Sequence, residues 1–223
     1  SMPGLSVNDA GSIRSRLHPR EILLGAQAAG AMLPVCDHYS GVEARMRKSL
    51  QLQAQMTAEL GRCVFDVTLD CEDGATVGQE VAHANAVAAL VREHAAAHPD
   101  ARIAVRVHAL DHPAFVDDVA RIVGQVGDKL THVMLPKAET VDQVDWVARA
   151  LDRAYGPRLP LHVLIESPAA VQQAFAIAAH PRVQSISFGL MDFVSAHGGA
   201  IPASALGVQG QFEHPPVLRA KLE

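Results

Sequence analysis

The sequence predicts an α/β protein built on a parallel sheet, and two features support that prediction. Short segments rich in valine and isoleucine alternate along the chain with longer amphipathic segments, which is the pattern of consecutive β/α units. The 223 residues are 49% hydrophobic and 19% charged, as in ordinary globular proteins. We expect one barrel-sized domain over residues 29–223, preceded by a weakly patterned N-terminal extension over residues 1–28.

Six strands are expected, and helices separate them. The expected strands are Ala31–Val35, Cys63–Leu69, Arg102–Val107, His132–Leu135, Leu161–Ile165 and Val183–Phe188. The expected helices are Val42–Leu60, Gln79–Ala97, Ala114–Val126, Val141–Ala154 and Pro168–Ala179. Two helix starts carry clear signals: Thr140 can cap the helix that follows it, and Ser167 precedes a proline, which is favoured at the first helical position.

Charged residues stand at the C-terminal ends of five consecutive strands. They are Asp70, Glu72 and Asp73, then Arg106, then Lys137 and Glu139, then Glu166, then Asp192. A closed barrel gathers such residues at one mouth, whereas an open doubly wound sheet uses mainly its switch point. No GxGxxG or Walker sequence favours a nucleotide-binding sheet. We therefore predict a TIM-type (β/α)8 barrel, here only its first six β/α units, because Phe193–Glu223 reads as a loop-like tail.

Glu166 and Asp192 are the candidate metal ligands. Each follows an apolar strand of buried type, and a carboxylate at the exposed end of such a strand packs against nothing. Hard divalent cations prefer oxygen ligands and leave room for water and substrate, so the pair predicts a site for Mg²⁺ or Mn²⁺. The alternative for Glu166 is an ion pair with a neighbouring lysine or arginine.

Composition excludes several other classes of protein. The net charge of -5 argues against nucleic acid as the main partner. No apolar run reaches the roughly 18 residues that a membrane span requires, so no membrane association is expected. The three cysteines lack CxxC spacing, which favours a reduced, cytoplasmic environment.

Five motifs, in order, resemble those of the HpcH/HpaI aldolase and citrate lyase β-subunit family, which includes the malyl-CoA lyases. They are Leu69-Asp70-Cys71-Glu72-Asp73, Val105-Arg106-Val107, Leu135-Pro136-Lys137-Ala138-Glu139-Thr140, Ile165-Glu166-Ser167-Pro168 and Ser187-Phe188-Gly189-Leu190-Met191-Asp192. The resemblance implies a (β/α)8 barrel that acts as a Mg²⁺-dependent carbon–carbon lyase. It also implies a 3-hydroxy acid or its CoA thioester as substrate, a 2-oxo acid or acyl-CoA as partner, and a homo-oligomer, trimer or hexamer.

The resemblance assigns roles to the candidate residues. Glu166 and Asp192 match the metal-binding carboxylates, and Arg106 matches the arginine that holds the substrate carboxylate and 2-oxo group. Glu72 and Asp73 match the catalytic acidic pair near the metal waters. The alternative for Arg106 is an ion pair with Asp70 or Glu72.

Two interpretations of Lys137 stay open. It could bind substrate, or it could be an electrostatic partner of nearby acids. A Schiff-base lysine would need a depressed pKa in an apolar pocket, and acids surround this one.

The chain departs from the family pattern in three places. Pro34–Gly41 stands where a Pro-Gly turn is usual after strand one, at the rim that binds coenzyme A. Cys71 and Gly74 replace leucine and alanine in the acidic motif. The resemblance also leads us to expect that the C-terminal strands and lid, which supply an acidic group to a neighbouring subunit in CoA-dependent members, are not included in these 223 residues.

Two other functions therefore stay open beside the lyase. One is a non-catalytic relative that binds metal and a 2-oxo acid or serves as a complex subunit. The other is a Mg²⁺ barrel enzyme acting on a phosphorylated or enolpyruvyl acid.

Overall fold

The structure, a computed structural model, describes residues 36–196 and 216–217 of the chain. The chain divides into two units between Pro34 and Val35, and the first unit lies outside the described residues. The predicted extension 1–28, the predicted strand Ala31–Val35 and most of the predicted tail are therefore outside them as well.

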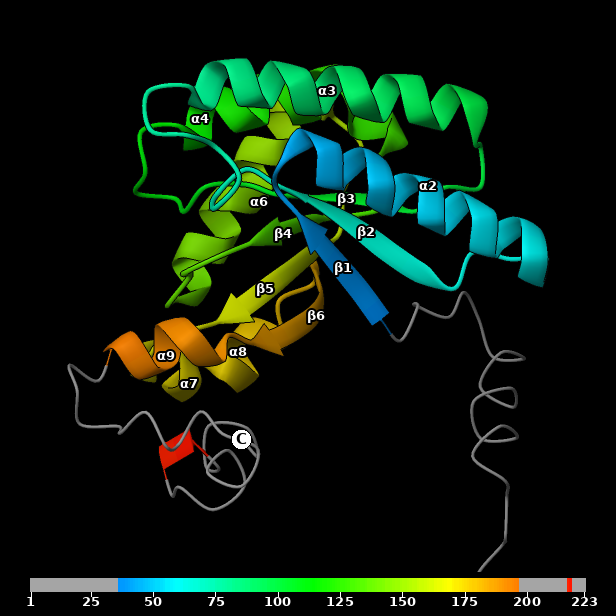
Figure 1. Ribbon diagram of the computed structural model, residues 1–223. Coiled ribbons are helices and arrows are strands. Elements are labelled where there is room, and N and C mark those ends of the chain that lie inside the picture. The colour runs from blue at the N-terminus through cyan, green and yellow to red at the C-terminus, as the bar shows by residue number, and fades with distance from the viewer. Residues whose placement is uncertain (1–35, 197–215, 218–223) are drawn as a thin grey trace, which may run out of the picture. The chain divides into compact units, whose positions relative to one another are not determined.

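Six parallel strands form one sheet whose spatial order follows the chain from β1 to β6 (Figure 1). Their bounds are β1 Cys36–Ser40, β2 Phe65–Asp70, β3 Ile103–Arg106, β4 Val133–Leu135, β5 Leu161–Ile165 and β6 Val183–Phe188. A doubly wound sheet would reverse its strand order, whereas a barrel keeps the order of the chain. The predicted parallel α/β sheet is confirmed. Its closure into an eight-stranded barrel stays a prediction, because the described residues contain six strands.

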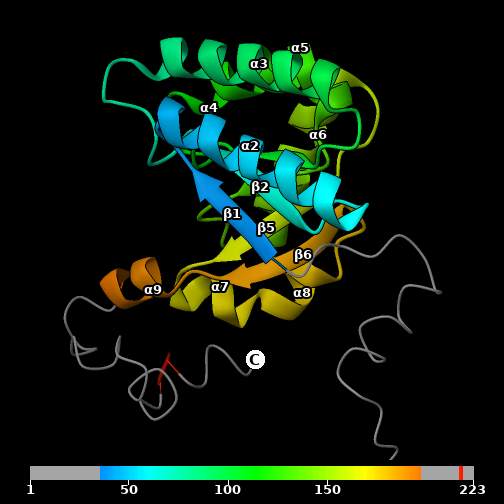
Figure 2. The same cartoon turned by 45° about the vertical axis from the view of Figure 1, so that its right-hand side comes forward.

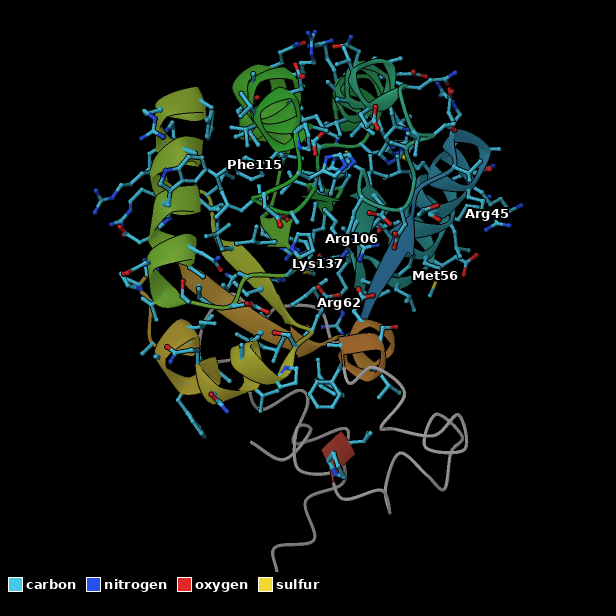
Figure 3. The ribbon with its side chains drawn as sticks, turned by 90° about the vertical axis from the view of Figure 1, so that its left-hand side faces the viewer. Arg45, Met56, Arg62, Arg106, Phe115 and Lys137 are labelled. Carbon is cyan, nitrogen blue, oxygen red and sulfur yellow. The ribbon has the colours of Figure 1, made fainter. Side chains whose placement is uncertain are left out.

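Helices connect the strands and form a ring around them in Figure 3. Their bounds are α2 Glu43–Leu60, α3 Glu80–Ala97, α4 Phe115–Asp118, α5 Gly124–Val126, α6 Val141–Tyr155, α7 Pro168–Gln172, α8 Ala174–Ala178 and α9 Leu190–Ala196. In Figure 2, α7 and α8 run beside β5 and β6. No helix in the described part of the chain is both long and apolar enough to cross a membrane.

The hydrophobic core lies between the sheet and the helices, and alternate strand residues supply it. Along β2, Val67 and Leu69 are fully buried in this core. Because successive side chains of a strand point to opposite faces, Asp66, Thr68 and Asp70 share the other face of the sheet. That other face therefore carries polar groups at both ends of β2, and its C-terminal end leads to the candidate site.

The first described strand begins later than predicted. Cys36–Ser40, expected as a loop, is strand β1 and pairs in parallel with residues 65–69 of β2. It contains neither valine nor isoleucine, so its composition gave no strand signal. Gly41 lies just beyond this strand, and a Cβ on Gly74 would stand 2.6 Å from the Cα of Gly41. This close approach of two backbones explains why glycine, rather than the family's alanine, stands at position 74.

Several helix predictions need correction. The helix expected over Ala114–Val126 contains a π-helical segment, η2, at Val119–Val123. The one expected over Pro168–Ala179 is two short helices that meet at Gln173. The loop-like tail does not begin at Phe193, because α9 continues to Ala196.

The two predicted helix caps are confirmed. The Thr140 side chain accepts a hydrogen bond from the Gln143 N–H in a reciprocal capping box, and the Ser167 side chain accepts one from the Ala170 N–H.

Strand β6 is less buried than its apolar sequence predicts. Its residues are exposed or half-buried, and the Ile186 side chain is 37% exposed. The reason is its place at the edge of the described sheet, where only β5 pairs with it.

Candidate active site

A cavity of about 470 Å³ lies at the C-terminal ends of β4 and β5. Its lining residues are Leu110, Asp111, Lys137, Glu139, Gln143, Glu166, Ser167, Asp192 and Ala196. Three predicted site residues thus come together here, namely Glu166, Asp192 and Lys137. The predicted residues Arg106, Glu72 and Asp73 are not among these lining residues. Glu72 forms an ion pair with Lys137 and another with Arg106, which in turn pairs with Asp73.

Arg106, at the end of β3, is surrounded by three carboxylates. Its Nε and Nη2 donate to the two oxygens of Asp70 at 2.8 and 2.6 Å. Nη1 lies 3.1 Å from Glu72 Oε2, and Nη2 lies 2.7 Å from Asp73 Oδ2. Burial alone would lower the pKa of Arg106, but Asp70, Glu72 and Asp73 outweigh it and raise that pKa. The structure therefore shows the ion pair that was the alternative interpretation of Arg106, and the substrate clamp remains a prediction.

The three acids around Arg106 differ in exposure. The side chains of Asp70 and Glu72 are 7% and 9% exposed, whereas that of Asp73 is 77% exposed. Asp70 also accepts the Glu72 N–H at 3.1 Å, so it orders the turn after β2. Asp73 is consequently the partner that a ligand carboxylate could replace at least cost, because water already surrounds it.

Lys137, in the loop between β4 and α6, joins two parts of the site. Its Nζ lies 2.7 Å from Glu72 Oε1, and its main-chain N–H donates to Glu166 Oε2 at 2.9 Å. The Glu72 hydrogen bond is the main cause that raises the pKa of Lys137, with further contributions from the charges of Glu72, Asp192 and Glu166. A Schiff-base role needs the opposite shift, so the geometry supports the electrostatic interpretation. Figure 3 shows Lys137 and Arg106 close together inside the ring of helices.

Glu166 is a buried carboxylate whose charge is unfavourable in its present surroundings. It is only 5% exposed, and its pKa is raised to about 7, first by burial and then by the charges of Asp192 and Glu72. The Lys137 N–H and the charge of Arg106 oppose that rise. Asp192 lies in the first turn of α9, not at the strand end where the sequence suggested it.

These two carboxylates suit a hard divalent cation. A cation between them would offset their mutual repulsion and the free-energy cost of burying the Glu166 charge. Carboxylate oxygens are also the ligands that Mg²⁺ prefers. Within the described ranges, no three or more His, Cys, Asp and Glu side chains are arranged as a metal site. Mg²⁺ usually keeps several water ligands and takes one or two carboxylates from the protein, so two carboxylates are compatible with a site for this ion.

Sequence reasoning missed some residues of the site. Gln143 belongs to the capping box of α6, and that Thr-x-x-Gln spacing was visible in the sequence. Ser167 directly follows Glu166 and donates to Glu139 Oε1 at 2.7 Å. Asp111 lies in the loop after β3, where no local pattern marked it. Gly189 is within contact distance of Glu166, which only the fold reveals.

Comparison with known proteins places the chain in a family. Residues 50–214 match HpcH/HpaI aldolase/citrate lyase, and the chain belongs to this family. The resemblance found in the five sequence motifs is thereby confirmed.

Three relatives illustrate the similarity. A crystal structure of a citrate lyase from Burkholderia xenovorans LB400 is 44% identical, with a TM-score of 0.77, and the match covers 86% of this chain and 59% of that one. A citrate lyase β subunit from M. tuberculosis, complexed with oxaloacetate and magnesium, is 25% identical with a TM-score of 0.55, over 75% of this chain and 63% of that one. The L-malyl-CoA/β-methylmalyl-CoA lyase of Cereibacter sphaeroides is 39% identical over 102 residues, which are 43% of this chain. The match spans 32% of that lyase, so the chain covers about a third of this curated relative.

Proposed function

We propose that this chain acts as a Mg²⁺-dependent carbon–carbon lyase on a 3-hydroxy acid or its CoA thioester. The single observation that carries the proposal is the pairing of Glu166 with Asp192 in a cavity beside Arg106. The family supports it, because its similar members include a β subunit bound to oxaloacetate and magnesium and a lyase of malyl-CoA.

In the proposed mechanism Glu166 and Asp192 would each give one oxygen to Mg²⁺, or to Mn²⁺ in its place. When bound, such a cation would supply Lewis-acid stabilisation of negative charge on the substrate oxygen that is a hydroxyl in the 3-hydroxy acid and becomes the 2-oxo group when the C–C bond breaks. Glu72 and Asp73 would orient the water molecules at this centre. Lys137 would hold the Glu72 side chain in place through its 2.7 Å ion pair.

Arg106 would hold the substrate carboxylate by exchanging one of its partners. Its planar guanidinium suits a two-point contact with a carboxylate, which lysine cannot reproduce. Asp70 would stay bound through its two short contacts, while the exposed Asp73 would yield its place. Substrate binding would then leave the buried part of the ion-pair network intact.

A non-catalytic binding protein for metal and a 2-oxo acid, or a complex subunit, is the second candidate. The observation in its favour is that three carboxylates hold Arg106, so a ligand must compete with Asp73 for the guanidinium. We also propose a homo-oligomer in the cytoplasm. Support for the oligomer comes from the half-exposed strand β6, which among the described residues pairs with β5 alone, since unpaired strand edges and exposed apolar side chains promote association.

A turnover assay separates the two candidates. The purified protein is incubated with Mg²⁺ and with malyl-CoA, citryl-CoA, methylmalyl-CoA or the free hydroxy diacids, and release of the 2-oxo acid or acetyl-CoA is followed. The Glu166→Gln variant should lose activity, while Asp128→Asn, a change in an exposed pair with Lys129, should retain it. Binding of Mg²⁺ and oxaloacetate without cleavage of any substrate would reject the lyase and favour the second candidate.

A further inference from the structure

The main chain of two loops holds the side chain of Glu166. On the β4–α6 loop, the Lys137 N–H donates to Oε2 at 2.9 Å. On the β6–α9 loop, Gly189 lies so near that a Cβ on it would stand 2.5 Å from Glu166 Cγ and 2.8 Å from Oε1. We propose that these two main-chain contacts fix the rotamer of Glu166 and leave one oxygen, Oε1, for the cation. The inference rests on the proposed function and extends it from the ligands to the residues that position them.

Lys137 contributes through an unusual backbone conformation. Its φ is 56°, and no other non-glycine residue in the described ranges has a positive φ. The left-handed region is unfavourable for a residue with a Cβ, and lysine lacks the short polar side chain that makes Asn and Asp tolerant of it. The conformation aims the N–H at Glu166, while Nζ pairs with Glu72 at 2.7 Å. Lys137 is thus a positioning residue whose main chain and side chain serve two different carboxylates.

Gly189 contributes by the absence of a side chain. Its φ is not in the left-handed region, since the described glycines with positive φ are Gly61, Gly78 and Gly156. Alanine would therefore fit the backbone conformation. Its methyl group would nevertheless collide with Glu166, and the backbone cannot easily retreat, because the Gly189 N–H donates to Ile165 O at 2.9 Å. Glycine is required here for the close approach to Glu166 and not for a turn.

Matched variants isolate each contact. Lys137→Gly and Lys137→Ala both remove the ammonium group and its pair with Glu72, and they differ only in the Cβ that disfavours the left-handed conformation. Gly189→Ala introduces the collision with Glu166. Gly124→Ala is its control, because a Cβ there would lie 3.6 Å from Ala154 O, an ordinary contact. Mg²⁺ binding is measured by titration calorimetry, Glu166 is observed in crystal structures, and urea unfolding without Mg²⁺ verifies that each variant is folded.

The expected results are specific to positioning. Mg²⁺ should bind Lys137→Ala about 5- to 30-fold more weakly than Lys137→Gly, the range that follows from the cost of a left-handed alanine. Gly189→Ala should weaken Mg²⁺ binding at least about tenfold and show a changed Glu166 rotamer, while Gly124→Ala should match the wild type. If Lys137→Ala does not fold, Lys137→Asn and Lys137→Ser form a second pair, because asparagine tolerates the conformation.

Two results would count against these ideas, and they are distinguishable. Equal Mg²⁺ affinity in the Lys137 pair, together with an unmoved Glu166 in Gly189→Ala, would overturn the positioning inference. Failure of the wild type to bind Mg²⁺ would reject the proposed function, and the Glu166 rotamers in the crystal structures would still decide the inference.

Discussion

Loss of stability in mild acid should trace largely to one buried histidine, His132. Its side chain is fully buried before β4 and stacks on that of His162, with ring centroids 3.5 Å apart. Burial, followed by the charges of His162 and Arg102, lowers the pKa of His132 from 6.5 to about 3. Asp66 Oδ2 lies 3.9 Å from Nδ1, but a 2.6 Å pair with Arg102 occupies that aspartate. His132 therefore stays neutral in the folded protein.

The sign and size of the effect follow from this shift. Because the folded-state pKa lies below the unfolded value, the unfolded chain takes up a proton that the folded protein refuses as the pH falls below 6.5. The contribution is present at pH 7 and is lost progressively as the pH falls toward about 3. A pH of 5 lies about 1.5 units below the unfolded-state pKa of 6.5. Protonation of this histidine therefore stabilises the unfolded chain at pH 5 by about 2 kcal/mol, at 1.36 kcal/mol per unit. That is a large share of a typical domain stability of about 5–15 kcal/mol.

The variant His132→Phe tests this reasoning. Phenylalanine keeps a ring against His162 and cannot titrate. It removes the 3.1 Å hydrogen bond between His132 Nδ1 and Thr131 Oγ1, but Thr131 Oγ1 still donates to Ile103 O at 3.2 Å. The other ring nitrogen, Nε2, has no hydrogen-bond partner among the described residues. The free energy of unfolding, measured in urea, should decrease between pH 7 and pH 5 by about 2 kcal/mol less in the variant than in the wild type. His98→Gln, a change at an exposed histidine, should keep the wild-type loss. Parallel losses in wild type and His132→Phe would refute the reasoning, as would an NMR titration that places the His132 pKa near 6.5.

Three further predictions concern the site and the sheet edge. Arg106→Lys should weaken oxaloacetate or glyoxylate binding by about 1–3 kcal/mol while Mg²⁺ affinity stays the same; calorimetry that finds equal acid affinity would assign Arg106 a purely structural role. Mg²⁺ affinity should fall about tenfold between pH 8 and pH 6, because the Glu166 pKa of about 7 lets protons compete with the cation; a flat profile in calorimetric titrations would contradict that ligand assignment. The protein should be oligomeric in light scattering, and Ile186→Asp at the half-exposed strand β6 should shift it toward smaller species; a wild-type monomer would exclude association through this edge.

Local sequence patterns were sufficient for most of the strands and helices of the fold. Runs of valine and isoleucine located five of the six strands to within two residues, and β5 and β6 fully, because buried parallel strands need apolar residues. Thr140 and Ser167 marked helix starts because capping depends on neighbours within three residues. Strand β1 was not predicted, because its stability comes from pairing with β2 and not from its own composition.

The candidate site also combines features that the local sequence predicts with features that depend on the tertiary structure. The sequence by itself indicated that Glu166 and Lys137 follow strands β5 and β4 and that Asp192 comes soon after β6, and these three residues line one cavity. That Asp192 reaches the cavity from the first turn of α9, and not from a strand end, is a result of the fold. Only the tertiary structure decided which of the charged residues contact one another. Asp70 and Arg106 face each other because parallel pairing of β2 and β3 aligns them, a register that neither segment encodes alone. The positive φ of Lys137 and the approach of Gly189 to Glu166 likewise depend on loops from β4 and β6 meeting at β5. Such contacts join residues more than 20 positions apart, where local propensities have no influence.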